Sequence, residues 1–293
     1  MSRDPRVPLR KKGDKYLKPL RVLCASFSFL LSLVFALVPQ AVYAQTETIV
    51  VYGDARTNHD IHRKIVGDIL SFNPRAVFST GDQVNDGRVS GEWVVFNEII
   101  SPLRKTSEFY PLLGNHERNA ELYFKNFQLP VSDRWYAVRK GPMIFFMLDS
   151  NWLIGPGSNQ HIWLEKQLQN VPKDVKFVAA VFHHPAVSSG PYPDEKNLQK
   201  RLLPLLEKYR VDIVFVGHEH VYERSYKDGI THVTTGGGGA PLHLQIRHNP
   251  YGKVFRAVHH FCVLQVTAQT LDVRVYDADL ALIDEFSLKS RRQ

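Results

Sequence analysis

Cysteine is scarce in this sequence. Of its two cysteines, Cys24 lies among the first 44 residues and Cys262 lies in the apolar run FCVLQV. If the N-terminal segment is removed, Cys262 remains alone, which excludes an intrachain disulfide bond in the rest of the chain. We expect Cys262 to be a small buried apolar residue, and we expect stability to depend on the hydrophobic core or on bound metal.

Long apolar runs are also rare, and the clear one lies near the N-terminus. Residues 1–21 hold eight lysines and arginines against two aspartates, residues 22–38 are uncharged and largely apolar, and small residues precede Gln45. This order is typical of a secretory signal peptide cleaved after Ala44, and it predicts an exported protein, periplasmic or extracellular. An uncleaved membrane anchor at residues 22–38 is the less favoured alternative, because seventeen residues are at the short end of a bilayer span.

Positive charge is in small excess once this segment is set aside. The whole sequence carries a formal net charge of +8, of which residues 1–44 contribute +6, so residues 45–293 carry only +2. The basic character of the whole sequence therefore gives no indication of a nucleic-acid partner.

Residues 45–293 contain no internal repeat, no low-complexity segment and no linker, so we expect one domain. Apolar segments of strand type alternate with segments of helical spacing, and a strand-rich region follows from Thr231 to Leu288. The earlier expected strands cover residues 47–52, 76–78, 143–148, 177–182 and 211–216, the expected helices cover residues 59–72, 93–103, 160–168 and 198–209, and residues 125–141 are expected to be mixed with extended structure. This alternation predicts an α/β sandwich.

Side chains that can bind metal follow several of these strands. They are Asp54, Asp82, Asn115, His183, His218 and His220. The carboxyl edge of the sheet in an α/β protein is left open by the helices, and ligands bind there. Carboxylate oxygen and imidazole nitrogen suit hard or borderline divalent ions, and two such ions need an anionic ligand between them. Each residue alone has a simpler interpretation, such as a helix cap for Asp54, but their joint placement favours a metal centre.

Five motifs, GDA, GDQVNDG, GNHE, HHP and GHEH, occur in this order between residues 53 and 220. Their order resembles that of the calcineurin-like metallophosphoesterases. The segments GHEHVYER and SNQHIWLEKQL, together with the glycines at 236–239, are most similar to the purple acid phosphatase branch. The resemblance implies a four-layer αββα sandwich over residues 45–293 that carries a two-metal centre.

The resemblance also implies a ligand set for each ion. One ion would be held by Asp54, Asp82 and His220. The other would be held by Asp82, Asn115, His183 and His218, so that Asp82 bridges the pair. His183 is preferred over His184 because the family ligand stands two residues before the proline.

Two positions depart from the family pattern. The first motif commonly reads Asp-x-His, and purple phosphatases carry a tyrosine three residues after the bridging aspartate; here these positions are Arg56 and Asn85. The first ion therefore loses one protein ligand, which water or Asn85 would replace. The iron–tyrosinate colour is expected to be absent, and the cofactors are expected to be two divalent or mixed-valence ions of Mn, Fe or Zn.

The expected reaction is attack on phosphorus by a hydroxide that bridges the two ions. His116, next to Asn115, is expected to protonate the leaving alkoxide. Arg56 is a candidate to clamp a phosphate oxygen, with a surface ion pair as the alternative. His184 is a weaker candidate to bind substrate, against a packing role. Glu117 is expected either to orient His116 or to be an acid in the first turn of a helix.

Together these features predict a metal-dependent phosphoesterase that hydrolyses small phosphate monoesters, of acid phosphatase type. A phosphodiesterase or nucleotidase on the same scaffold is the alternative among enzymes. A catalytically weak metal- or phosphate-binding module is the alternative of another class, because one ligand is missing. We expect no membrane span after signal cleavage, and the sequence leaves the oligomeric state open.

Overall fold

The structure is a computed structural model that describes residues 47–129, 133–192 and 194–292. The predicted signal peptide, residues 1–44, and the alternative anchor at residues 22–38 lie outside the described residues. Within the described residues, every helix is too short or too polar to cross a membrane.

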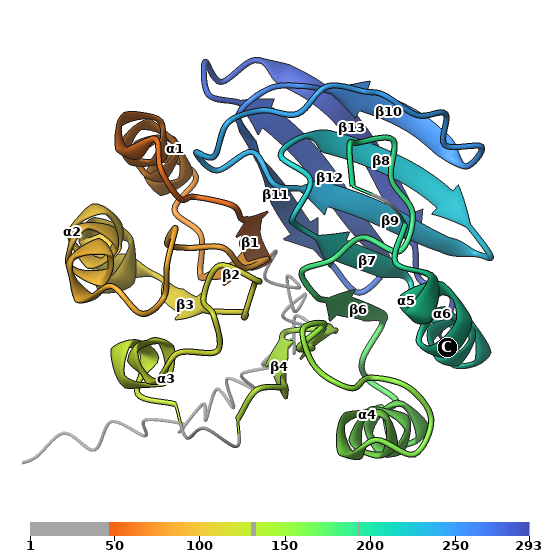
Figure 1. The fold of residues 1–293 in the computed structure, drawn as a ribbon. Helices are drawn as coiled ribbons and strands as arrows, with labels where there is room; N and C mark the ends of the chain where they lie inside the picture. Colours follow the sequence, from red (N-terminus) through yellow and green to blue (C-terminus); the bar gives the residue numbers. More distant parts are fainter. Residues whose placement is uncertain (1–46, 130–132, 193, 293) are drawn as a thin grey trace, which may run out of the picture. The chain divides into compact units, whose positions relative to one another are not determined.

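The first sheet has six strands in the order β13-β12-β11-β1-β2-β3 (Figure 1). Their bounds are β1 Glu47–Tyr52, β2 Ala76–Ser79, β3 Glu108–Tyr110, β11 His260–Val266, β12 Thr270–Asp277 and β13 Leu282–Lys289. Strands β1, β2 and β3 are parallel, whereas β11 pairs with β1 in the antiparallel sense and continues into β12 and β13. The C-terminal strands thus complete the sheet begun by the first strand.

The second sheet has seven strands in the order β10-β8-β9-β7-β6-β5-β4. Their bounds are β4 Tyr136–Lys140, β5 Met143–Met147, β6 Phe177–Val181, β7 Ile213–Val216, β8 Tyr222–Lys227, β9 Ile230–Thr235 and β10 Gly252–Arg256. Strands β5, β6, β7 and β9 are parallel, β4 and β8 are antiparallel to their neighbours β5 and β9, and β10 is antiparallel to β8. The strand-rich C-terminal region expected from the sequence is therefore divided between both sheets.

Helices cover the outer face of each sheet. Against the first sheet lie α1 His59–Ser71, α2 Ser90–Thr106 and α3 Glu121–Phe127, and against the second lie α4 Asn159–Gln169, α5 Lys196–Arg201 and α6 Leu203–Lys208. The inner faces pack on each other, and the Phe78 and Phe145 rings stack between them with centroids 4.0 Å apart. Both faces of the central strands are buried, which explains why these strands are apolar throughout. The predicted four-layer αββα sandwich is confirmed (Figure 1).

Two sequence expectations about local structure are wrong. The single helix expected over residues 198–209 is two helices, because Pro204 in the first turn of α6 has no N–H to donate to the preceding turn. Helix α3 was not expected. Its aromatic residues Tyr123 and Phe127 pack against Trp93 of α2, so tertiary contacts support this helix, whose last three residues fall in the region 125–141. The extended structure expected in that region is confirmed by β4.

Candidate metal centre

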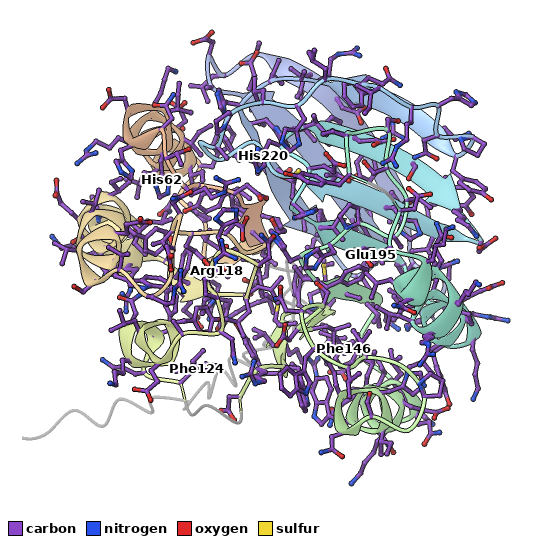
Figure 2. All side chains as sticks on the ribbon, viewed as in Figure 1. His62, Arg118, Phe124, Phe146, Glu195 and His220 are labelled. Atoms are coloured by element: carbon purple, nitrogen blue, oxygen red, sulfur yellow. The ribbon has the colours of Figure 1, made fainter. Side chains whose placement is uncertain are left out.

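Loops at the carboxyl ends of β1, β2, β6 and β7 meet at one edge of the sandwich, marked by the His220 label in Figure 2. Asp54, Asp82 and His218 have positive φ angles of 56°, 53° and 67°. This left-handed region costs energy for residues other than glycine, and strained residues of this kind cluster at functional sites. The chain therefore turns sharply at three of the predicted metal ligands.

The predicted ligands of the second ion lie within contact of one another. The Nε2 atom of His183 is 3.4 Å from Asp82 Oδ1 and 3.0 Å from Asn115 Oδ1. The Nδ1 atom of His218 is 2.9 Å from the same Asn115 oxygen and 3.3 Å from His183 Nε2. The structure thus brings all four of these side chains together.

The predicted ligands of the first ion lie beside them. The Nε2 atom of His220 is 3.6 Å from Asp54 Oδ1, and the carboxylate of Asp54 accepts the backbone N–H of His218 at 3.0 and 3.1 Å. Asp54, Asp82 and His183 each offer an atom within 4.8 Å of the others. Asp54 and Asp82 are almost fully buried, so their negative charge needs a nearby cation. Burial and the charge of Asp82 raise the pKa of Asp54 well above its usual value.

The protonation pattern of the histidines fits a bound cation. His183 Nδ1 lies 2.8 Å from the Thr80 carbonyl oxygen, and His220 Nδ1 lies 2.6 Å from the Pro241 carbonyl oxygen, so each Nδ1–H donates to the backbone. Burial lowers the pKa of His183 well below its usual value and that of His220 to about 4, which keeps both rings neutral. Each Nε2 lone pair therefore faces a carboxylate oxygen, a contact that a cation between the two atoms would stabilise.

His116 lies at the rim of this cluster. Its backbone N–H donates to Asp82 Oδ1 at 2.9 Å, and its Nδ1 lies 2.6 Å from the Asn85 carbonyl oxygen. Its Nε2 is 3.9 Å from Asp82 Oδ2, and the side chain keeps 20% of its exposure. The imidazole thus presents Nε2 to the site while Nδ1 is held by the backbone.

His184 lies beside His218, with ring centroids 4.6 Å apart. The Ser150 hydroxyl accepts the backbone N–H groups of His183 and His184 at 3.2 and 3.1 Å, and it lies 2.8 Å from His184 Nδ1. Because the hydroxyl oxygen already accepts two bonds, its own hydrogen is free to donate to Nδ1. In that arrangement His184 carries its proton on Nε2 and is a donor, whereas a metal ligand needs a lone pair there.

Glu117 does not have either of the roles expected for it. Its buried carboxylate accepts the backbone N–H groups of Asp82, Gln83 and Gly114 at 3.0, 2.8 and 2.6 Å, and it lies outside the helices. Burial, followed by the charge of Asp82, raises the pKa of Glu117 to about 8. Glu117 therefore holds the loop that carries Asp82 and does not contact the imidazole of His116 through any of these bonds.

Sequence reasoning missed residues that support the two histidines of GHEH. The Tyr192 ring lies 4.5 Å from the His218 ring, and the His243 ring stacks on His220 at 4.1 Å. His243 Nδ1 is 2.9 Å from Oε2 of the buried Glu219. Glu219 lies inside the GHEH motif, which draws attention to it. Nothing in the sequence around Tyr192 or His243 indicates that their rings contact those of His218 and His220.

The glycines at 236–239 support the site from behind. The N–H groups of Gly238 and Ala240 donate to the carbonyl oxygens of Gly53 and Asp54, both at 2.8 Å. A Cβ at Gly236 would lie 2.3 Å from the Glu219 carbonyl oxygen, and one at Gly238 would lie 2.5 Å from the Gly53 carbonyl oxygen. Close packing against backbone, rather than access for substrate, explains this glycine run.

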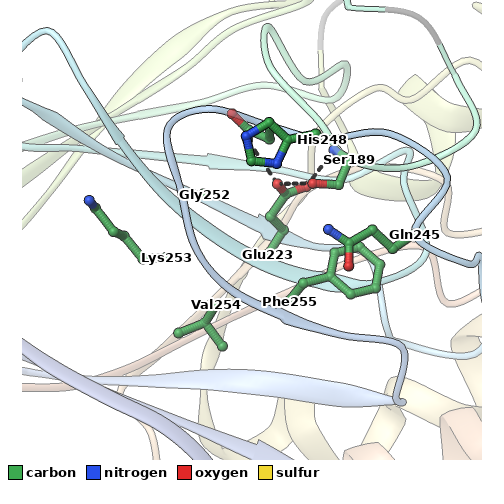
Figure 3. Close-up of a pocket in the computed structure, with 9 residues that line it drawn as sticks. Ser189, Glu223, Gln245, His248, Gly252, Lys253, Val254 and Phe255 are labelled. Carbon is green, nitrogen blue, oxygen red and sulfur yellow. Dashed lines mark hydrogen bonds between the residues drawn. The ribbon is translucent and has the colours of Figure 1, made fainter.

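The described residues line several cavities. One of about 150 Å³ borders the predicted ligand Asn115 and is lined also by Arg118 and Arg134. Another, of about 240 Å³, is shown in Figure 3 and includes none of the predicted ligands in its lining. In the latter, both oxygens of the Glu223 carboxylate already accept hydrogen bonds, from Ser189 and Asn249.

Comparison with known proteins agrees with this geometry. The family model for calcineurin-like phosphoesterases matches residues 47–222, more than half of the chain. A probable purple acid phosphatase 20 from Arabidopsis thaliana is 30% identical over 195 residues, covering 56% of this chain and 46% of that protein. Purple acid phosphatase 7 from the same plant is 25% identical over 263 residues, covering 78% of this chain and 79% of that protein. The chain thus spans less than half the length of the former relative.

Solved structures share the fold. Purple acid phosphatase PPD1 from yellow lupin (Lupinus luteus) seeds aligns with a TM-score of 0.73 and 20% identity, covering 84% of this chain and 54% of that one. GAP50, described as the anchor in the inner membrane complex of Plasmodium, aligns with a TM-score of 0.68 and 16% identity, covering 85% of this chain and 90% of that one. On the match over residues 47–222, this chain belongs to the calcineurin-like phosphoesterase family.

Proposed function

We propose that this protein is a metal-dependent phosphatase that hydrolyses small phosphate monoesters, of acid phosphatase type. The observation that carries the proposal is the pair of neutral, buried histidine Nε2 atoms of His183 and His220, each facing a carboxylate oxygen at the carboxyl edge of the sheets. Such a donor set suits Mn, Fe or Zn. We further propose export after cleavage near Ala44, as the N-terminal pattern predicts.

The four clustered side chains Asp82, Asn115, His183 and His218 would hold one metal ion, and Asp54, Asp82 and His220 form the second cation position. When bound, the metal would supply Lewis acidity at the phosphate and an activated water as nucleophile. With Nδ1–H held by the Asn85 carbonyl, the doubly protonated ring of His116 would deliver its Nε2 proton to the leaving oxygen and become the neutral imidazole. His184 would donate its Nε2–H to a phosphate oxygen, with Ser150 fixing its tautomer.

Two alternatives remain open on this scaffold. A phosphodiesterase or nucleotidase would use the same groups, since the leaving group is chosen by loops around the site. A catalytically weak binding module is favoured by one observation, the replacement of the family histidine by Arg56.

The test is hydrolysis of a chromogenic monoester and a chromogenic diester by the purified protein, before and after removal of metal with a chelator and after re-addition of Mn(II). We expect monoester hydrolysis that is lost with the metal and restored by Mn(II). Faster turnover of the diester would assign a phosphodiesterase instead. Retained metal binding without hydrolysis of either ester would assign a binding module.

A further inference from the structure

Arg56 is the residue that replaces the histidine of the family motif, and its side chain turns into the site. Its Nε atom lies 3.5 Å from Asp82 Oδ2, and its Nη2 atom lies 3.4 Å from His220 Nε2. Its Nη1 donates to Asn85 Oδ1 at 3.3 Å. The side chain is only 13% exposed, so the alternative of a surface ion pair at the start of α1 is wrong.

All three partners of Arg56 belong to the expected site of the first ion. Asp82 and His220 are predicted ligands of the first ion, and Asn85 stands where purple phosphatases carry the tyrosine that binds that ion. The guanidinium therefore contacts the side chains that are expected to surround the first ion. A metal ion bound to the same Asp82 and His220 atoms would compete with it for that space and would be repelled by its charge.

The chemistry of the contacts is consistent with a resident cation. His220 donates through Nδ1 to the Pro241 carbonyl, so its Nε2 lone pair can accept from Arg56 Nη2. Arg56 Nε is buried and has no hydrogen-bond partner among the described residues, and it lies 3.5 Å from Asp82 Oδ2. The guanidinium is always charged, so it offsets part of the negative charge that Asp54 and Asp82 bury.

The backbone that carries Arg56 is fixed. The carbonyl oxygens of Gly53 and Asp54 accept bonds from Gly238 and Ala240, and a Cβ at Gly239 would lie 2.8 Å from the Ala55 carbonyl oxygen. The loop after β1 is thus held by hydrogen bonds and close backbone packing against the glycine run. These contacts leave the arginine stem anchored next to Asp82.

We propose that the Arg56 guanidinium takes the place of the first metal ion, so that the centre holds one exchangeable metal ion, bound by Asp82, Asn115, His183 and His218. The relevance of this proposal to catalysis rests on the proposed function. The proposal itself concerns the number of bound metal ions, which is measured without an assay of hydrolysis. It replaces the expected pair of ions by one ion and one fixed organic cation.

The experiment measures bound Mn(II) per chain. The full-length protein is stripped with a chelator, dialysed against saturating MnCl₂, and analysed for bound metal, with circular dichroism to check folding. We expect about one Mn(II) per chain in the wild type and about two in Arg56→His, which restores the Asp-x-His motif. Arg88→His is the matched control, because Arg88 is exposed and forms its ion pair with Asp86, outside the predicted ligands. This variant should bind as much Mn(II) as the wild type does.

The Mn(II) electron paramagnetic resonance spectrum of the wild type distinguishes one bound ion from a coupled pair. This test does not depend on whether Arg56→His folds. An isolated-ion hyperfine pattern supports the proposal, and a spin-coupled pair overturns it. Binding of two ions by the wild type, or no gain of metal in Arg56→His over Arg88→His, also overturns it. If the wild type binds one ion but hydrolyses no ester, the proposed function fails while this inference stands.

Discussion

The carboxylate of Glu117 accepts the backbone N–H of Asp82 at 3.0 Å, from 35 residues further along the chain. The same carboxylate accepts the N–H groups of Gln83 and Gly114, so one buried side chain fixes the turn after β2 and the turn that precedes Asn115. Two predicted ligands of one ion are therefore positioned by a residue that does not bind the ion itself.

Replacing Glu117 should weaken metal binding. Glu117→Gln leaves only one strong acceptor for three N–H donors, and supporting residues of this kind contribute about 10- to 100-fold to metal affinity. We expect the Kd for Mn(II), measured by isothermal titration, to rise by that factor. Glu121→Gln is the control, since Glu121 lies exposed in the first turn of α3. Unchanged affinity in Glu117→Gln would mean that the loop holds its shape without this carboxylate.

Replacing His116 should slow the chemical step and leave the metal in place. Loss of a general acid costs about 10²- to 10⁴-fold in rate, and the loss should be largest for an alkyl phosphate, whose leaving oxygen needs the proton most. We expect kcat of His116→Ala to fall by such a factor on an alkyl monoester, less on a nitrophenyl monoester, with metal content unchanged. His59→Ala, at an exposed position, provides the control. An equal loss on both esters would argue against proton donation.

Replacing His184 should affect substrate binding rather than metal content. Deleting one hydrogen bond to a charged phosphate oxygen costs about 1.5–3 kcal/mol, which corresponds to about 10- to 100-fold in kcat/KM. We expect this loss in His184→Ala, and a similar direction in Ser150→Ala, which frees the tautomer of His184. Metal analysis is the second measurement. A drop in bound metal in His184→Ala would identify His184 as a ligand and contradict the donor role.

Acid should destabilise the protein through a histidine outside the site. His62 is buried in α1, where its Nε2 lies 3.1 Å from the Tyr52 hydroxyl, and burial lowers its pKa to about 3. Because the unfolded value is 6.5, the contribution of the neutral ring is complete above pH 6.5 and is lost as pH falls toward the folded value.

This pH effect can be isolated by mutation. Between pH 7 and pH 5, we expect urea unfolding of the wild type to lose about 2 kcal/mol more than that of His62→Gln, in which no proton is gained on unfolding. The chelator-treated proteins should be compared, so that metal binding does not contribute. His248→Gln should keep the wild-type slope, since His248 is exposed and is not among the groups that shift the pKa of His62. Parallel pH slopes in wild type and His62→Gln would contradict the assignment.

Most strands and helices could be predicted because the sequence patterns that specify them are local. Apolar strands that end in glycine and a polar ligand, such as the run before Asp82, specify both a buried strand and its exit, and the structure places them as expected. The break at Pro204 also has a local cause, because proline has no backbone N–H to donate to the preceding turn. Helix α3 was not readable, because Trp93 and other distant aromatic rings stabilise it.

The sequence predicts which residues gather at the site better than it predicts which side chains contact one another there. The motifs point to Asp54, Asp82 and His183, and the structure gathers them at one edge. The direction taken by Arg56 depends on where His220 and Asn85 lie in space, which no local pattern encodes. Likewise, Glu117 contacts backbone amides from two separate turns, so its role follows only from the folded arrangement.

Strand β1 pairs with β11, His260–Val266, and the loop after β1 is held by the N–H of Ala240. During translation, Asp54 therefore leaves the ribosome long before the segments that fix its orientation have been made. The predicted ligands can therefore take their final arrangement only after the segment through β11 has been made, so a chain that stops before His260 should lack the pairing that supports β1.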